Sequence, residues 1–295
     1  MKQEKPDYAV VVNRPSRVGE GSIWDSGRSV LYWVDILDGK VFAFNPETGK
    51  NREWDTCQAV GTVVPRGSGG VSVALHNGFA HLDLETGRLS PIVDPEAELP
   101  SNRFNDGKCD PAGRFWAGTM DYFGEKEDRG ALYCLHPDGK AERKISPATI
   151  SNGLAWSLDT TTMYYVDTGR NNVRAYDYDV ETGDVRNERI AIQCEPSGHF
   201  DGITIDAEGM LWIAIFGGGG IRRYNPDTGE LLCEYLLPVS QVTSVALGGR
   251  DLTDLYVTSA SHGFDTDQWN REPLAGSLLC LESEIPGIPA FSFAG

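Results

Sequence analysis

The sequence predicts an all-β fold, a six-bladed β-propeller in which residues 1–295 form a single domain. Two observations predict it: short strand-like runs separated by glycine turns, and a polar residue that recurs in a repeat of about 45 residues. No segment shows the 3.6-residue period of an amphipathic helix, so almost no helix is expected. Neither a linker nor a low-complexity stretch divides the chain.

Tight turns punctuate the chain at nearly regular intervals. Each begins with an Asn, Asp or His and ends with a Gly, which takes a positive φ at no steric cost. The runs that precede the turns are rich in aromatic and β-branched residues, as is typical of strands with side chains on alternate faces. The turns lie at residues 45–49, 83–87, 136–139, 179–183 and 225–229, and the runs include 30–34, 163–166, 211–215 and 255–257.

A polar residue recurs five positions before a loop-forming residue, and this spacing divides the chain into units. Segments 105–116 and 201–212 correspond in their spacing, with Asp, Gly and Trp at the same three positions. One unit between Glu20 and Asn105 lacks the recurring polar residue; we call it the silent unit, and a strand at 69–75 belongs to it. A sixth unit follows at 243–247, with Ser244 at the position of the recurring polar residue. Six such units match the blades of a propeller. The recurring pairs are Glu20 and Asp25, Asn105 and Asp110, Asn152 and Ser157, and Asp201 and Asp206.

Glu20, Asn152 and Asp201 are predicted to hold one divalent cation at the mouth of the central channel. The first strand of every propeller blade lines the channel, so equivalent repeat positions meet around one axis. Two carboxylates and an amide offer only oxygen ligands, which suit Ca²⁺, Mg²⁺ or Mn²⁺, with Zn²⁺ also possible. The alternative is that the three side chains only cap turns or satisfy amides at blade edges.

Composition restricts the partners and the compartment. With 26 basic and 43 acidic side chains the net charge is −17, which disfavours nucleic acid and anionic membrane surfaces. The six cysteines have no metal-ligand spacing and are expected to be reduced thiols. No apolar run is long enough for a signal peptide or a membrane helix, so the cytoplasm is the expected compartment. The sequence leaves the oligomeric state open.

Motifs along nearly the whole chain resemble those of the senescence-marker/gluconolactonase/regucalcin family of lactonases. The resemblance implies a six-bladed propeller whose metal is held by Glu20, Asn152 and Asp201. It also implies that Arg103 and Asn105 contact a sugar, and that the enzyme hydrolyses a small sugar-acid lactone with Asp201 as the general base. The motifs lie at residues 19–24, 103–108, 110–114, 117–120, 151–154, 201–209 and 291–295.

Two positions depart from the pattern of that family. Phe123 stands where regucalcin-like members carry a substrate-contacting glutamate, and Phe200 stands where a proline usually precedes the Asp-Gly pair. The preference among sugar lactones is therefore open, as is contact of Phe123 or His199 with the substrate.

A lactone is an ester, and a bound cation can polarise its carbonyl group and activate water without a nucleophilic side chain. No Gly-x-Ser-x-Gly motif supports a serine hydrolase. Asp201 could accept the proton of the water, and the guanidinium of Arg103 could hold sugar hydroxyls. Two alternatives stay open: a calcium-binding or scaffold propeller without catalysis, and hydrolysis of organophosphates or aryl esters on the same metal.

Overall fold

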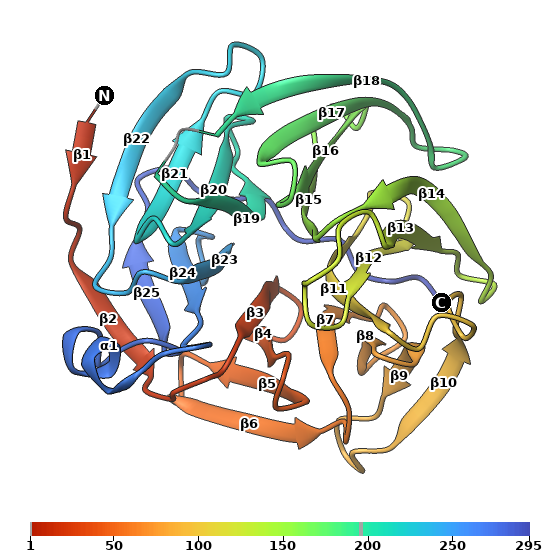
Figure 1. Cartoon of the computed structure of the whole chain (residues 1–295), viewed down its shortest axis with the longest axis horizontal. Coiled ribbons are helices and arrows are strands. Elements are labelled where there is room, and N and C mark those ends of the chain that lie inside the picture. The colour runs from red at the N-terminus through yellow and green to blue at the C-terminus, as the bar shows by residue number, and fades with distance from the viewer. Residues whose placement is uncertain (1, 195–196) are drawn as a thin grey trace.

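Six small antiparallel sheets stand around a central axis in the computed structural model, which describes residues 2–194 and 197–295 (Figure 1). The six-bladed β-propeller predicted from the sequence is confirmed. One short helix, α1 (Thr266–Arg271), occurs in the described part of the chain and lies at the periphery of the ring. No helix among these residues is long and apolar enough to cross a membrane.

The first four blades each use four strands that follow one another in the chain from the channel outward. Blade 1 comprises β3 (Gly19–Asp25), β4 (Val30–Asp35), β5 (Lys40–Asn45) and β6 (Lys50–Asp55). Blade 2 comprises β7 (Val60–Pro65), β8 (Val71–Leu75), β9 (Gly78–Leu82) and β10 (Leu89–Val93). Blade 3 comprises β11 (Asn102–Cys109), β12 (Phe115–Asp121), β13 (Gly130–Leu135) and β14 (Ala141–Ala148). Blade 4 comprises β15 (Ser151–Trp156), β16 (Thr162–Asp167), β17 (Asn172–Asp179) and β18 (Asp184–Gln193).

The two ends of the chain complete the last two blades and so close the ring. In blade 6, β2 (Tyr8–Val12) pairs antiparallel with β25 (Leu278–Glu282), which joins the two ends of the chain in one sheet. In blade 5, β1 (Lys2–Glu4) adds in parallel to the outer strand. The remaining strands are β19 (His199–Ile205), β20 (Leu211–Phe216), β21 (Gly220–Tyr224) and β22 (Leu231–Leu236) in blade 5, and β23 (Val242–Gly248) and β24 (Asp254–Ser259) in blade 6.

The silent unit of the sequence is blade 2, and the strand expected at residues 69–75 is present in it. Residues 71–75 form β8, the second strand, whereas β7 is the strand next to the channel. The five-position spacing does not reveal β7, because this strand has no carboxylate or carboxamide side chain. The described cysteines are all free, in agreement with the expected reduced thiols.

The shared Asp and Trp of the corresponding segments in blades 3 and 5 are explained by one hydrogen-bonded motif. In blade 3, Asp110 is fully buried and its Oδ1 accepts the main-chain N–H groups of Ala112 and Arg114. Its Oδ2 accepts the Trp116 indole N–H at 2.8 Å and the Arg114 Nε–H at 2.6 Å. In blade 5 the Asp206 carboxylate accepts the indole N–H of Trp212 in the same way, at 3.1 Å. Each aspartate therefore fixes a turn and the packing of a core tryptophan together.

Replacement of Asp110 by Ala is expected to lower the free energy of unfolding by about 3–5 kcal/mol, because it leaves the buried Arg114 guanidinium without its carboxylate. Asp179→Ala is the matched control: Asp179 also accepts two main-chain N–H groups, from Glu181 and Thr182, but lies at the exposed end of β17. Its loss should cost roughly 0.5–1.5 kcal/mol. Urea unfolding followed by tryptophan fluorescence measures both, and equal losses would contradict the role given to Asp110.

Candidate metal and substrate site

Three polar side chains from different blades meet at the channel. Glu20 lies on β3, Asn152 on β15 and Asp201 on β19, and all three are buried. Asn152 and Asp201 lie within an interruption of regular strand pairing near the start of their strands, and Glu20 is the last paired residue before such an interruption. Bulges of this kind turn a side chain away from the ordinary alternation of the strand. We call Glu20, Asn152 and Asp201 the channel cluster.

A glycine follows each member of the channel cluster and lets the inner strands approach closely. A Cβ atom on Gly153 would lie 2.7 Å from the main-chain oxygen of Asp201, and one on Gly202 would lie 2.9 Å from the Cα of Ser244. Any other residue would force these strands apart. The Gly21 N–H also donates to the Glu20 carboxylate at 2.6 Å. The glycines therefore set both the spacing of the inner strands and the orientation of at least one carboxylate.

The two carboxyl groups of the channel cluster have strongly perturbed acidity. Burial raises the pKa of Glu20 well above its usual range, and the nearby charge of Asp201 adds to this. Burial likewise raises the pKa of Asp201, and the charge of Asp106 adds to it. Asp201 also interacts directly with the side chains of Glu20 and Asn152. Burial and mutual repulsion therefore both favour the protonated form of these carboxyl groups when no cation is bound.

Two buried oxygen atoms of the channel cluster have no hydrogen-bond partner within residues 2–194 and 197–295: Asn152 Oδ1 and Asp201 Oδ1. The opposite side of the amide is fixed, because Asn152 Nδ2 donates to Thr168 Oγ1 at 2.9 Å. Thr168 Oγ1 in turn donates to the main-chain oxygen of Phe200 at 2.8 Å. Buried oxygens without partners are costly unless something else binds them. Oxygen donors of this kind fit a hard divalent cation.

No group of three or more His, Cys, Asp or Glu side chains that could hold a metal ion is found in the described part of the chain. The channel cluster is a different set, since one of its three members is an amide.

Asp106 and Lys108 were not singled out from the sequence, although Asp106 is buried and Lys108 half-buried beside the channel cluster. Asp106 directly follows the polar repeat residue of blade 3, at the place where other blades carry Gly21, Gly153 or Gly202. The Asp106 carboxylate accepts the main-chain N–H of the next residue at 2.7 Å. An aspartate in place of the repeated glycine is the signal that could have revealed it. Burial raises its pKa, although the Lys108 ammonium opposes the shift.

Lys108 places a positive charge inside the channel. Its Nζ donates to the main-chain oxygen of Ile203 at 2.6 Å. Burial lowers the pKa of Lys108, whereas the charges of Asp106 and Glu20 act in the opposite direction. The lysine therefore offsets part of the carboxylate charge that the inner strands bring together.

Arg103 and Asn105 form one rigid unit next to the channel cluster. The Arg103 guanidinium donates from Nη1 to Asn105 Oδ1 at 2.8 Å and from Nε to the main-chain oxygen of Tyr122 at 3.2 Å. Asn105 Nδ2 donates to the main-chain oxygen of Ser151 at 2.9 Å. Burial lowers the pKa of Arg103 to about 10, against the opposing charges of Tyr122 and Glu20. Arg103 therefore stays charged at neutral pH in a fixed orientation.

The structure places His199 at the exposed first position of β19, beside Phe200 and Asp201. Phe123 is 80% exposed, and its ring packs against that of Tyr122 with the centroids 5.1 Å apart. Because the Tyr122 carbonyl group holds Arg103, the segment with Phe123 is tied to the predicted substrate-binding unit. Contact of either residue with substrate stays a prediction.

Comparison with known proteins gives matches along nearly the whole chain. The family model described as SMP-30/Gluconolactonase/LRE-like region matches residues 18–261. Regucalcin of Danio rerio is 40% identical over 289 residues, which cover 97% of each chain. A Bacillus subtilis protein named as a candidate sugar lactone lactonase, YvrE, is 36% identical over 94% of this chain and 95% of its own. The crystal structure of a calcium-binding protein, regucalcin, from Agrobacterium tumefaciens has a TM-score of 0.95 at 28% identity and covers 99% of each chain.

The matched region contains the channel cluster as well as Arg103 and Asn105. With this match and the full-length similarity to regucalcin, the chain belongs to the SMP-30/gluconolactonase/LRE-like family.

Proposed function

We propose that the protein hydrolyses a sugar-acid lactone, using one divalent cation held by Glu20, Asn152 and Asp201. The observation that carries the proposal is the pair of buried oxygens without partners, Asn152 Oδ1 and Asp201 Oδ1, beside a second buried carboxyl group. Membership of a family that includes gluconolactonases supports the substrate class. The oxygen donors suit Ca²⁺, Mg²⁺ or Mn²⁺ and allow Zn²⁺, and a relative described as calcium-binding supports the first of these.

A bound divalent cation would supply Lewis acidity toward the lactone carbonyl group. Asp201 accepts a proton from the attacking water, a role for which a carboxylate with a raised pKa is suited. Cleavage of the ring C–O bond then leaves a hydroxyl group and a carboxylate on one open-chain product. Arg103 and Asn105 hold the hydroxyl groups of the sugar. Both side chains are fixed by hydrogen bonds before the substrate binds, so they orient the sugar without having to be ordered themselves.

A second candidate is a calcium-binding propeller without catalysis, which the calcium-binding relative of known structure favours. An aryl esterase or organophosphate hydrolase fits less well, because the buried Arg103 and Asn105 offer polar groups rather than an apolar pocket. Release of acid from D-glucono-1,5-lactone, corrected for spontaneous hydrolysis, separates the lactonase from the pure binder. A parallel assay with an aryl ester separates the lactonase from the esterase.

Asp201→Asn should retain part of the metal affinity and lower kcat by about 10²- to 10⁴-fold, because the amide cannot accept the proton of the water. A pH indicator that follows acid release from gluconolactone gives kcat, and calorimetric titration with Ca²⁺ gives the affinity. Asp138→Asn, in an exposed turn, is the matched control and should behave as the unmodified protein. Full turnover in the Asp201 variant would remove Asp201 from the role of general base.

Thr168→Val should weaken Ca²⁺ binding by about 10- to 100-fold, because the Asn152 amide loses the acceptor that fixes its orientation. Thr168→Ser keeps the hydroxyl group and should bind with nearly the original affinity. Calorimetric titration of both variants provides the comparison. Equal affinities for the valine and serine variants would show that Thr168 does not orient the amide.

Without metal, the free energy of unfolding should fall as the pH rises above the usual carboxyl range. The folded pKa values of Glu20 and Asp201 lie above their unfolded values, so the folded protein binds more protons in this window. A bound cation takes the place of the proton, so its stabilising effect should grow with pH.

Melting temperatures at pH 5.5 and pH 8, with EDTA or with excess Ca²⁺, measure this dependence. The difference between the two additives should be larger at pH 8. In the double variant Glu20→Gln, Asp201→Asn, most of this difference in melting temperature should disappear. If the melting temperature with EDTA equals that with excess Ca²⁺ at both pH values, this result counts against the metal site.

A further inference from the structure

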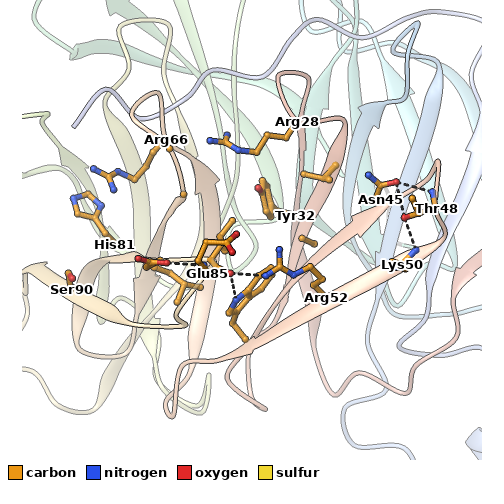
Figure 2. A pocket seen from close by; sticks show the side chains of 18 residues that line it. Arg28, Tyr32, Asn45, Thr48, Lys50, Arg52, Arg66, His81, Glu85 and Ser90 are labelled. Carbon is orange, nitrogen blue, oxygen red and sulfur yellow. Dashed lines mark hydrogen bonds between the residues drawn. The ribbon is translucent and has the colours of Figure 1, made fainter.

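A second site lies away from the channel cluster, in a cleft of about 780 Å³ between blades 1 and 2 (Figure 2). Blade 1 contributes residues of β4, β5 and β6, and blade 2 contributes residues of β9 and the turn between β7 and β8. Glu20 lies near the start of β3, whereas Arg28 of the cleft lies in the turn after β3 ends. The cleft is therefore at the opposite end of the inner strand from the proposed catalytic site. We call it the interblade cleft.

The interblade cleft is cationic in a strongly acidic protein. Its charged lining comprises four cationic side chains and two carboxylates, whereas the whole chain has 26 basic and 43 acidic residues. The two carboxylates, Asp83 and Glu85, both belong to the exposed turn between β9 and β10. Asp83 already accepts the N–H groups of Glu85 and Thr86. The four cations are Arg28, Lys50, Arg52 and Arg66.

Each of the three arginines is held in place by one hydrogen bond from one nitrogen of its guanidinium group. Arg28 Nη1 pairs with Asp25 at 2.7 Å. Arg52 Nη2 donates to the main-chain oxygen of Leu84 at 2.8 Å, and Arg66 Nε donates to that of Gly295 at 3.1 Å. These are the only side-chain hydrogen bonds of the three guanidinium groups within the described residues. Most of their donors are therefore fixed in position yet not used by the protein, which lowers the entropic cost of ligand binding.

Arg28 also reaches across the cleft from blade 1 to blade 2. Its Nη2 lies 3.7 Å from the position that a Cβ atom on Gly69 would occupy. Gly69 belongs to the same turn as Arg66, whose main-chain oxygen accepts the Gly69 N–H. Two guanidinium groups from different blades therefore flank one opening, and Figure 2 shows Arg28, Arg52 and Arg66 arranged around Tyr32.

Tyr32 and His81 add polar atoms that the protein does not use. Tyr32 is 1% exposed, and its hydroxyl group makes no hydrogen bond within residues 2–194 and 197–295. Burial raises its pKa to about 12, so the hydroxyl stays protonated and can donate. His81 Nδ1 lies 3.0 Å from Ser72 Oγ. The remaining ring nitrogen of His81, on the blade 2 side of the cleft, is available to a ligand.

We propose that the interblade cleft binds a small organic phosphate. Guanidinium forks match the oxygens of a phosphate group, which carries more charge than one carboxylate at neutral pH. The volume is in the range of small-molecule sites. Because the net charge of −17 repels anions at long range, binding depends on these few cations at short range.

Calorimetric titration with fructose 1,6-bisphosphate tests the proposal, with fructose and citrate as parallel ligands. The bisphosphate should bind, and fructose should not. Arg28→Gln and Arg66→Gln should each weaken binding by about tenfold or more, and Lys50→Gln by a smaller factor. Glu85→Gln removes a repelling charge at the rim and should strengthen binding. Arg186→Gln, in an exposed hairpin of blade 4, is the matched control and should bind as the unmodified protein does.

A second readout locates the ligand independently of these variants. Histidine ring signals in NMR spectra should shift for His81 on titration with the bisphosphate, and not for His262, which lies in blade 6 outside the cleft. Absence of binding, or affinity unchanged in both arginine variants, would overturn the proposal. If citrate binds as tightly as the bisphosphate and through the same arginines, the cleft is a site for polycarboxylates, and the assignment to organic phosphates is overturned.

Discussion

The close approach of the inner strands around the channel is the constraint on which the rest of the molecule depends. Gly153 and Gly202 leave no room for a side chain, so the strands of blades 4, 5 and 6 pack backbone to backbone. In a channel lined this closely, the charges of Glu20, Asp106 and Asp201 act on one another. Burial then denies these charges the solvation that would screen them. The fold therefore creates an electrostatic cost at one point, and that point is where a cation would be most favourable.

The blades tolerate this cost because their outer parts are fixed by other interactions. Asp110 and Asp206 each tie a turn to a core tryptophan, so the inner strand and the next strand keep their register. At the ring closure, β2 and β25 join the two ends of the chain in one sheet, so that blade 6 does not separate from blade 1. Hydrogen bonds and strand pairing around the whole ring, rather than in one loop, thus oppose the repulsion between the carboxylates in the channel.

The sequence predicts the parts of the molecule that repeat. Glu20, Asn152 and Asp201 could be found because the same position recurs on strands that share one axis. The channel strand of blade 2 could not, since β7 lacks the polar residue on which the spacing relies. The roles expected for the channel cluster are predictions that the proposed experiments test, and contact of Arg103 and Asn105 with a sugar is a prediction from the family resemblance.

What the sequence could not show arises from contacts between blades or from departures within the repeat. Asp106 was missed because it replaces a repeated glycine, and a search for equal residues overlooks an exception. Lys108 looks like an ordinary strand residue until its Nζ is found on the main chain of blade 5. The interblade cleft has no sequence signature, because Arg28 and Arg66 come from turns of different blades and meet only through packing.

The balance of buried charge gives the proposed chemistry a physical basis. Ionised Glu20, Asp106 and Asp201 are three negative charges, and Arg103 and Lys108 supply two positive ones, so the channel without a cation carries one negative charge in excess. Protonation of one carboxyl group removes this excess, which agrees with the raised pKa values. A divalent cation with all three carboxylates ionised instead leaves one positive charge in excess. Negative charge that develops on the oxygen of a lactone during hydrolysis would then be neutralised within the site, and preorganised compensation of this kind stabilises the transition state more than the neutral substrate.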